Sequence, residues 1–157
     1  MSITAAPAFR DFLAYVGEAG YANEQPPTKH LPDGSHDIVL ERDGWKYHDN
    51  WFGGEPFGGM EVISKGEKPF WMMVYFGAII DPSEEPADVY TALKEALRQP
   101  DAAMPVRGQR KLAASNGYSY AFIWTGDLDR FQGQENICNP QGALIYKSEV
   151  SGGLINQ

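Results

Sequence analysis

Apolar residues recur along this chain at two different periods, and each period predicts a different kind of element. Between positions 9 and 16, four apolar residues are spaced three or four apart, as on one face of a helix. They predict a first helix within residues 7–20. The same spacing over residues 89–97 predicts a second helix, which Ser83 would cap and Pro100 would end.

The remaining apolar and aromatic residues favour β-strands. Asp43-Gly44 and Asn116-Gly117 are typical of hairpin turns. Residues 69–78 are apolar or aromatic almost throughout, which predicts a strand buried on both faces. A long loop is expected over residues 21–36. The predicted strands are 37–42, 45–52, 57–65, 69–78, 109–115, 118–125, 131–138 and 142–150.

One motif occurs twice in this series of elements. Phe57-Gly58-Gly59-Met60-Glu61 in the first half corresponds to Phe131-Gln132-Gly133-Gln134-Glu135 in the second. Trp51 and Trp124 precede the two copies in matching positions, and the two helices correspond as well. Several matches in the same order indicate an internal duplication.

We therefore expect an α+β fold in a single domain, residues 1–157. Two helix-plus-four-strand halves, about 1–80 and 81–157, would form antiparallel sheets related by a pseudo-twofold axis. Hydrophobic residues make up 43% and charged residues 22% of the chain, as in ordinary soluble globular proteins.

The charge of the chain excludes some classes of partner. The formal net charge is -8, and no run of Lys or Arg offsets it, so we expect no binding of nucleic acid by this chain alone and no attachment to a membrane. Cys138 is the only cysteine, which excludes an intrachain disulfide and suits a reducing compartment. Residues 1–8 show no signal peptide, so we expect a cytoplasmic location.

The repeated motif is the strongest candidate for a site. In a strand, Phe, Gly and Glu at alternate positions point to the same face, so each copy would hold a carboxylate beside an aromatic ring. If the halves meet at a pseudo-dyad, Glu61 and Glu135 would lie near each other. The structural alternative is that Phe packs, Gly bends the strand and Glu accepts backbone hydrogen bonds.

Other chemistry has little support in the sequence. Ser35-His36-Asp37 and His48-Asp49 place His beside Asp, but no spacing typical of a metal site appears, so we expect no metal. No fingerprint for a nucleotide or another cofactor is present, and we expect none. Cys138 has no basic neighbour that would activate its thiol.

Three motifs resemble those of an uncharacterised bacterial family of domains of unknown function. They are Tyr47-His48-Asp49-Asn50-Trp51-Phe52-Gly53-Gly54, Phe57-x-Gly59-x-Glu61 and Pro69-x-Trp71-x-Met73-x-Tyr75-x-Gly77. The resemblance covers nearly the whole chain and implies no particular activity. Members of that family are sometimes fused behind a helix-turn-helix of the XRE type, which implies a sensor role. No helix-turn-helix is visible in this sequence.

Our leading hypothesis is a module that binds a small planar or cationic molecule in a pocket near the pseudo-dyad, without catalysing a reaction. The candidate ligand-binding residues are Glu61, Glu135, Trp51, Trp71, Tyr75 and Trp124. The enzyme alternative is a Glu-dependent hydrolase, which the similar settings of the two Glu residues disfavour. The third alternative is a protein-interaction or oligomerisation domain, including a homodimer.

Overall fold

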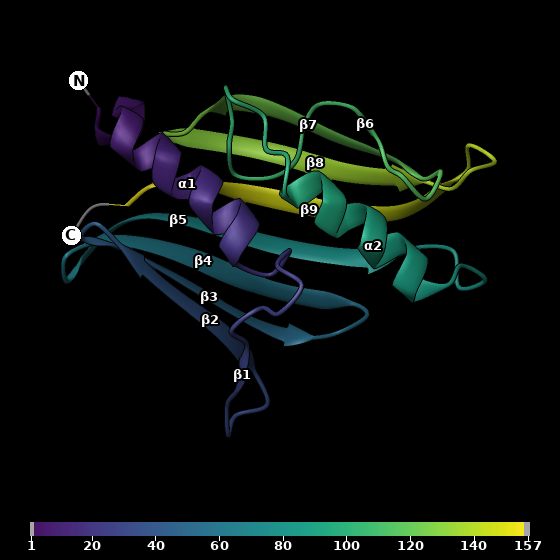
Figure 1. The fold of residues 1–157 in the computed structure, drawn as a ribbon, viewed down its shortest axis with the longest axis horizontal. Coiled ribbons are helices and arrows are strands. Elements are labelled where there is room, and N and C mark those ends of the chain that lie inside the picture. Colours follow the sequence, from purple (N-terminus) through teal and green to yellow (C-terminus); the bar gives the residue numbers. More distant parts are fainter. Residues whose placement is uncertain (1, 156–157) are drawn as a thin grey trace.

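The computed structural model describes residues 2–155 as one nine-stranded antiparallel sheet with two helices on one of its faces (Figure 1). Neither of these helices is long and apolar enough to cross a membrane. The helices and the 3-10 turn are η1 (Ile3–Ala5), α1 (Pro7–Ala19) and α2 (Pro86–Leu97). The strands are β1 (Lys29–His30), β2 (His36–Arg42), β3 (Trp45–Gly53), β4 (Phe57–Lys65), β5 (Lys68–Ile79), β6 (Leu112–Ala113), β7 (Ser119–Asp127), β8 (Arg130–Cys138) and β9 (Leu144–Leu154).

The expected fold class is wrong, because the sheet is one continuous structure. Its strand order is β1-β2-β3-β4-β5-β9-β8-β7-β6, and the two meanders join where β5 pairs antiparallel with β9 along its length, from Trp71↔Leu154 to Ile79↔Tyr146. The protein is therefore mostly sheet, and not a balanced α+β fold of two helix-plus-four-strand halves.

The strand count also differs between the two sides of this junction. Residues 109–115 were expected to form a full strand, but only Leu112–Ala113 pair, because the chain after α2 crosses the covered face of the sheet instead. On the other side, Lys29–His30 form an additional short strand inside the expected loop.

The Phe-x-Gly-x-Glu motifs occupy equivalent positions in their meanders. Phe57 on β4 pairs with Gly53 on one side and Gly77 on the other. Phe131 on β8 has the same two kinds of neighbour, Gly126 and Gly152. Glycine at these places gives each aromatic ring room, because a Cβ at Gly77 would approach the Phe57 ring to 2.7 Å.

The second helix begins later than its sequence predicts. Pro86 is its first residue, where the fixed φ of proline favours a helix and the missing N–H costs nothing. Ser83 is not the N-cap, since its hydroxyl donates a 2.7 Å hydrogen bond to Asp81 in the preceding turn. Glu85 is the capping residue and makes no side-chain hydrogen bond to the helix.

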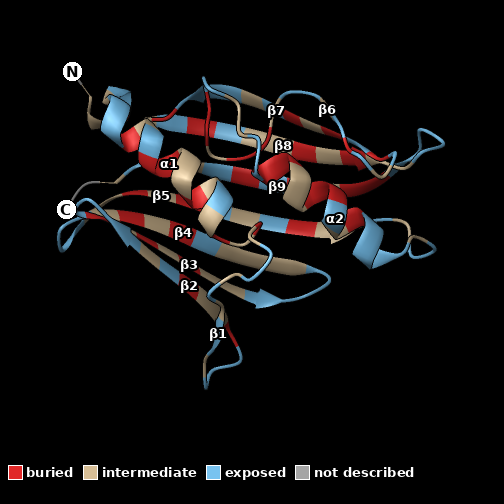
Figure 2. Ribbon diagram, in the orientation of Figure 1, coloured by how far each residue is buried: buried red, intermediate tan, exposed pale blue. Residues whose placement is uncertain are grey.

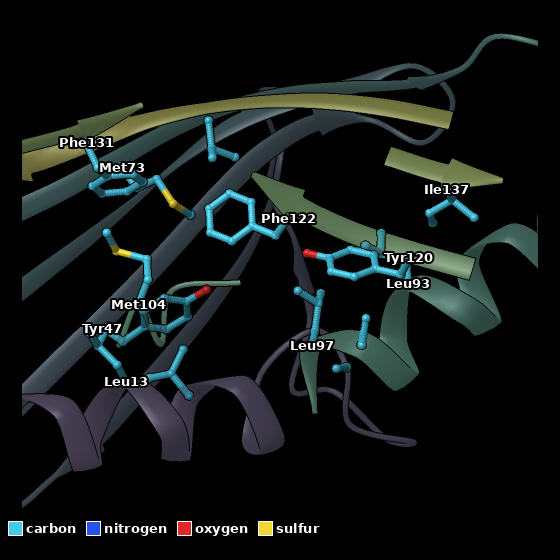
Figure 3. Close-up of a cluster of buried hydrophobic side chains, with 14 of the residues drawn as sticks. Leu13, Tyr47, Met73, Leu93, Leu97, Met104, Tyr120, Phe122, Phe131 and Ile137 are labelled. Carbon is cyan, nitrogen blue, oxygen red and sulfur yellow. The ribbon is translucent and has the colours of Figure 1, made fainter. Parts of the chain in front are cut away.

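The core lies between the two helices and the face of the sheet that they cover, as the burial colours show (Figure 2). Phe9 on α1 packs its ring against Trp45 and Trp71 at centroid distances of 5.6 and 6.1 Å. Figure 3 shows Leu13 from α1 and Leu97 from α2 in the same buried cluster as sheet residues. Burial of these side chains supplies the main favourable free energy of folding.

The opposite face of the sheet is uncovered, which corrects the expectation that residues 69–78 are buried on both faces. Along β5, Trp71 and Met73 are fully buried, whereas Val74 and Phe76 are 45% and 62% exposed. The apolar run predicted two covered faces, but both helices pack against the same face. Exposed Met60 lies beside Val74 on the neighbouring strand β4. Exposed Ile123 lies farther away on β7, with Gln134 and Glu149 between it and Phe76.

Candidate functional site

A cavity of about 320 Å³ lies between the two helices and the covered face of the sheet. Leu13 and Val16 from α1 and Leu93 and Leu97 from α2 form its apolar wall. Strands β2 to β5 and the segment after α2 supply the opposite wall, which contains all but one of the ionisable groups of the cavity. These groups are His36, Tyr47, Asp49, Glu61, Tyr75 and Arg107, together with Tyr21 from the chain after α1.

Two carboxylic acids lie next to each other in the sheet wall. Asp49 on β3 and Glu61 on β4 are direct cross-strand partners, so their side chains project from the same face. Both are nearly enclosed, with 4% and 8% of their surfaces exposed, and both line the cavity. Two acids brought together this closely in a buried wall interact strongly through their charges.

Tyr75 on β5 contacts the two acids' part of the cavity wall. The register places Gly59 between Trp51 on β3 and Tyr75 on β5. The Tyr75 hydroxyl donates a 2.5 Å hydrogen bond to Oδ1 of Asp49 across β4. This hydrogen bond joins β5 and β3, which are not adjacent in the sheet.

The burial of the two acids changes their protonation. Burial raises the pKa of Glu61 to about 8, and the charge of Asp49 adds to this effect. Burial also raises the pKa of Asp49 to about 6, although the hydrogen bond from Tyr75 opposes the rise. The cavity wall therefore favours retention of a proton by the pair near neutral pH, with Glu61 as the group that holds it more tightly.

A second buried cluster lies beside the first. The guanidinium of Arg107 donates a 2.7 Å hydrogen bond to Oε1 of Glu135, and the hydroxyl of Tyr120 donates one of 2.5 Å to Oε2. The backbone N–H of Gly108 in turn donates to the Tyr120 hydroxyl at 3.0 Å. Burial alone would lower the pKa of Arg107, but the carboxylate of Glu135 raises it well above its usual value.

The two motif glutamates therefore have different surroundings, although the sequence predicts similar ones. Glu61 faces another acid, Asp49, across the neighbouring strand, whereas Glu135 faces the ring of Phe122. Glu135 is fully buried and its two oxygens accept hydrogen bonds from Arg107 and Tyr120. Glu135 does not line the cavity.

The structure separates the six candidate residues into two groups. Glu61, Trp51 and Tyr75 line the cavity. Trp71 lies in the core, where its indole N–H donates a 2.8 Å hydrogen bond to the carbonyl oxygen of Leu128. Trp124 also lies outside the cavity, and the guanidinium carbon of Arg110 stacks over its ring at 3.6 Å from the centroid.

Several residues that line the cavity are not among the candidate ligand-binding residues predicted from the sequence. Asp49 and Tyr47 alternate with Trp51 on β3, so the period of a strand would have placed all three on one face. Nothing in the sequence indicates that Arg107 reaches the cavity, because the segment after α2 has no regular period. The Nε of Arg107 and the Nδ1 of His36 are buried without a hydrogen-bond partner among residues 2–155.

An antiparallel sheet with a cavity between it and two covering helices, apolar on the helix side and polar on the sheet side, defines this molecule as a protein with an internal pocket. Residues 49–155 match the family described as a domain of unknown function, DUF5680, and the chain belongs to that family. The match begins at Asp49 and includes Glu61 and Arg107. No curated protein and no solved structure is significantly similar to the chain.

Proposed function

We propose that this protein binds a small organic molecule in the cavity between α1, α2 and the sheet. The observation that carries the proposal is the placement of Asp49 and Glu61 side by side in the wall of a space of about 320 Å³. Sites for small molecules are usually apolar clefts of this order of size with a few convergent polar groups. The helices supply the apolar wall and the sheet supplies the polar groups.

The aromatic residues of the cavity favour a ligand with a flat portion. The rings of His36 and Trp51 are stacked, with centroids 5.4 Å apart and planes 18° apart, and Tyr21 meets Trp51 edge to face. Phe57 and Tyr75 line another part of the same wall. Rings of this kind offer large rigid surfaces at a small cost in side-chain entropy.

A thermal-shift screen of small metabolites tests the proposal, with Glu61→Gln and Asp49→Asn as the variants. Compounds that raise the melting temperature of the wild type should give a smaller shift with either variant. Glu149→Gln is the matched control, because Glu149 pairs with Phe76 and Gln134 away from the cavity. A ligand that stabilises all four proteins equally would bind elsewhere and would contradict the proposal.

A sensor role rests on the sequence resemblance alone. If relatives of this chain carry an XRE-type helix-turn-helix, binding of a ligand in the cavity would be the signal that the fused domain transmits.

A second candidate function is self-association through the uncovered face of the sheet. Phe76 and Ile123 are 62% and 57% exposed there, which is unusual for large apolar residues of a monomer. Two sheets packed face to face would bury both residues. Sedimentation of the wild type and of a Phe76→Ser, Ile123→Ser double variant tests this, and a monomeric wild type at high concentration would exclude it.

A further inference from the structure

We propose that the cavity selects molecules with a protonated amine, and that such a molecule replaces a proton held by the Asp49–Glu61 pair. This inference rests on the proposed binding function and specifies its ligand class. The amine enters as an ammonium ion and the proton leaves the carboxyl pair for the solvent. No covalent bond between ligand and protein forms or breaks.

The balance of buried charge is the first argument. Arg107 and three acids, Asp49, Glu61 and Glu135, are each at least nine-tenths buried in two adjoining clusters. The hydrogen bond from Arg107 to Glu135 at 2.7 Å pairs the cation with one of these acids. The Asp49–Glu61 pair is thus left with no dedicated cation, and a buried charge without a partner is costly.

The surroundings of the pair supply no other full positive charge. The titratable groups that face it are Tyr21 from the chain after α1, His36 on β2, Tyr47 on β3, Tyr75 on β5, Arg107 from the segment after α2 and Glu135 on β8. His48 lies next to Asp49 on β3, but it projects from the opposite face and contacts Asp37 at 3.2 Å. Of these groups, only a protonated imidazole would add positive charge to that of Arg107 beside the pair.

The cavity wall suits an organic cation better than a metal ion. Trp51, Phe57 and Tyr75 border the same space as the two acids. Aromatic faces attract ammonium groups, and carboxylates accept strong hydrogen bonds from them. The unpartnered Nδ1 of His36 is a further ring nitrogen in this wall, whereas the unpartnered Nε of Arg107 can only donate and does not favour an ammonium group.

Proton exchange follows from the enclosure of Asp49 and Glu61 side by side in the cavity wall. Burial raises the pKa of Glu61 to about 8, so the empty pair retains a proton at neutral pH. An ammonium group beside the pair would favour the fully ionised form and lower that pKa. Binding of one amine should therefore release close to one proton near neutral pH and become tighter as the pH rises toward 8.

Matched pairs of probes test the selection. Tryptamine and benzylamine would each be compared with the alcohol of the same shape, tryptophol and benzyl alcohol, by calorimetric titration of the full chain. We expect each amine to bind the wild type more than about tenfold more tightly than its alcohol. Titration in two buffers with different ionisation enthalpies should show release of about one proton per amine bound.

Two variants separate the parts of the inference. Glu61→Gln leaves Asp49 ionised, so amines should still be preferred but without proton release near neutral pH. Asp49→Asn combined with Glu61→Gln should remove the preference for the amine. Glu149→Gln should behave as the wild type does.

The proton can also be observed without a ligand. The infrared spectrum of the wild type at neutral pH should contain the carbonyl stretch of a protonated carboxyl group, and this band should be absent from Glu61→Gln. This measurement keeps the inference testable even if the double variant does not fold.

Each failure has a distinct meaning. Equal binding of amine and alcohol would overturn the selection and leave the binding function intact. Amine binding without proton release, or absence of the infrared band, would contradict the claim that the Asp49–Glu61 pair holds a proton. If neither amine binds but the thermal-shift screen finds a compound whose effect depends on Asp49 and Glu61, the amine selection is wrong and the binding function stands. If the screen finds no such compound either, both proposals are wrong.

Discussion

Arg107 and Glu135 form a buried ion pair between the segment after α2 and strand β8, with 2.7 Å between Nη2 and Oε1. The Arg107 side chain is 9% exposed and that of Glu135 is fully buried. The pair fixes the segment that closes the cavity to the central part of the sheet. Glu135 thus supports the wall of the cavity, whereas Glu61 forms part of the wall itself.

Loss of Glu135 should destabilise the protein strongly. Glu135→Gln would leave the Arg107 charge buried without a carboxylate, and removal of one member of a buried pair usually costs about 3–5 kcal/mol. Urea unfolding followed by tryptophan fluorescence measures this cost. A double variant, Arg107→Met with Glu135→Met, should lose less than the sum of the two single changes. A free energy of unfolding for Glu135→Gln within about 0.5 kcal/mol of the wild type would contradict the expectation.

Replacement of Glu61 should change how stability depends on pH. The pKa of Glu61 is raised to about 8 in the folded protein from an ordinary value of 4.5, so the folded state holds a proton that the unfolded state releases. The contribution of Glu61 to the free energy of unfolding should therefore be greatest below about pH 4.5, and it should be lost as the pH rises to 8. Burial likewise raises the pKa of Asp49 to about 6, so titration of Asp49 also lowers the stability as the pH rises, over a lower pH range.

Glu61→Gln removes this titration. Its unfolding free energy should gain more than about 1 kcal/mol relative to the wild type between pH 5 and pH 8.5. Urea unfolding at a series of pH values measures the difference. Parallel curves for the two proteins would show that Glu61 is ionised in the folded state throughout this range.

Loss of the Tyr75 hydroxyl should raise the pKa of Asp49 further. The 2.5 Å hydrogen bond from Tyr75 favours the ionised form of Asp49, and Tyr75→Phe removes it. The cost in stability should be about 1 kcal/mol, as for a typical hydrogen bond. An NMR titration of the labelled Asp49 carboxyl carbon measures the shift, and an unchanged midpoint would argue that this hydrogen bond is weak in solution.

The motif glycine on β4 should not tolerate a side chain. A Cβ at Gly59 would lie 2.3 Å from the carbonyl oxygen of Asn50 and 2.6 Å from the Cβ of Trp51, so Gly59→Ala must displace backbone. We expect a loss of about 1–3 kcal/mol in thermal or urea unfolding. Gly54→Ala is the control, because nothing lies within 4 Å of a Cβ at Gly54. Equal stability of the two variants would show that β3 and β4 move apart easily.

The sequence predicts the elements well because their periods are local properties. The first helix, the hairpin at Asp43-Gly44 and most strands lie close to their expected positions, since amphipathic spacing and turn residues act over a few positions. The merging of both meanders into one sheet is not local. It depends on the pairing of β5 with β9, which are separated in the sequence by residues 80–143.

The site was predicted only in part, for a related reason. Of the six candidate residues, Trp51, Glu61 and Tyr75 line the cavity, and the other three do not. The equivalence of the two motifs concealed a difference in the strand beside them, because Asp49 in one meander corresponds to Phe122 in the other. Reading the neighbours of each motif, and not only the motif, would have separated the two glutamates.

The ends of the sheet have a consequence for how copies of this protein can meet. The outermost strands, β1 and β6, are only two residues long each, and each covers just one end of its neighbour, His36–Asp37 of β2 and Ser119–Tyr120 of β7. Among residues 2–155, most of β2 and most of β7 therefore have no outer strand beside them and form the margins of the sheet. Unpaired margins are places where another strand can add to a sheet, so contact between two molecules need not be confined to the open face.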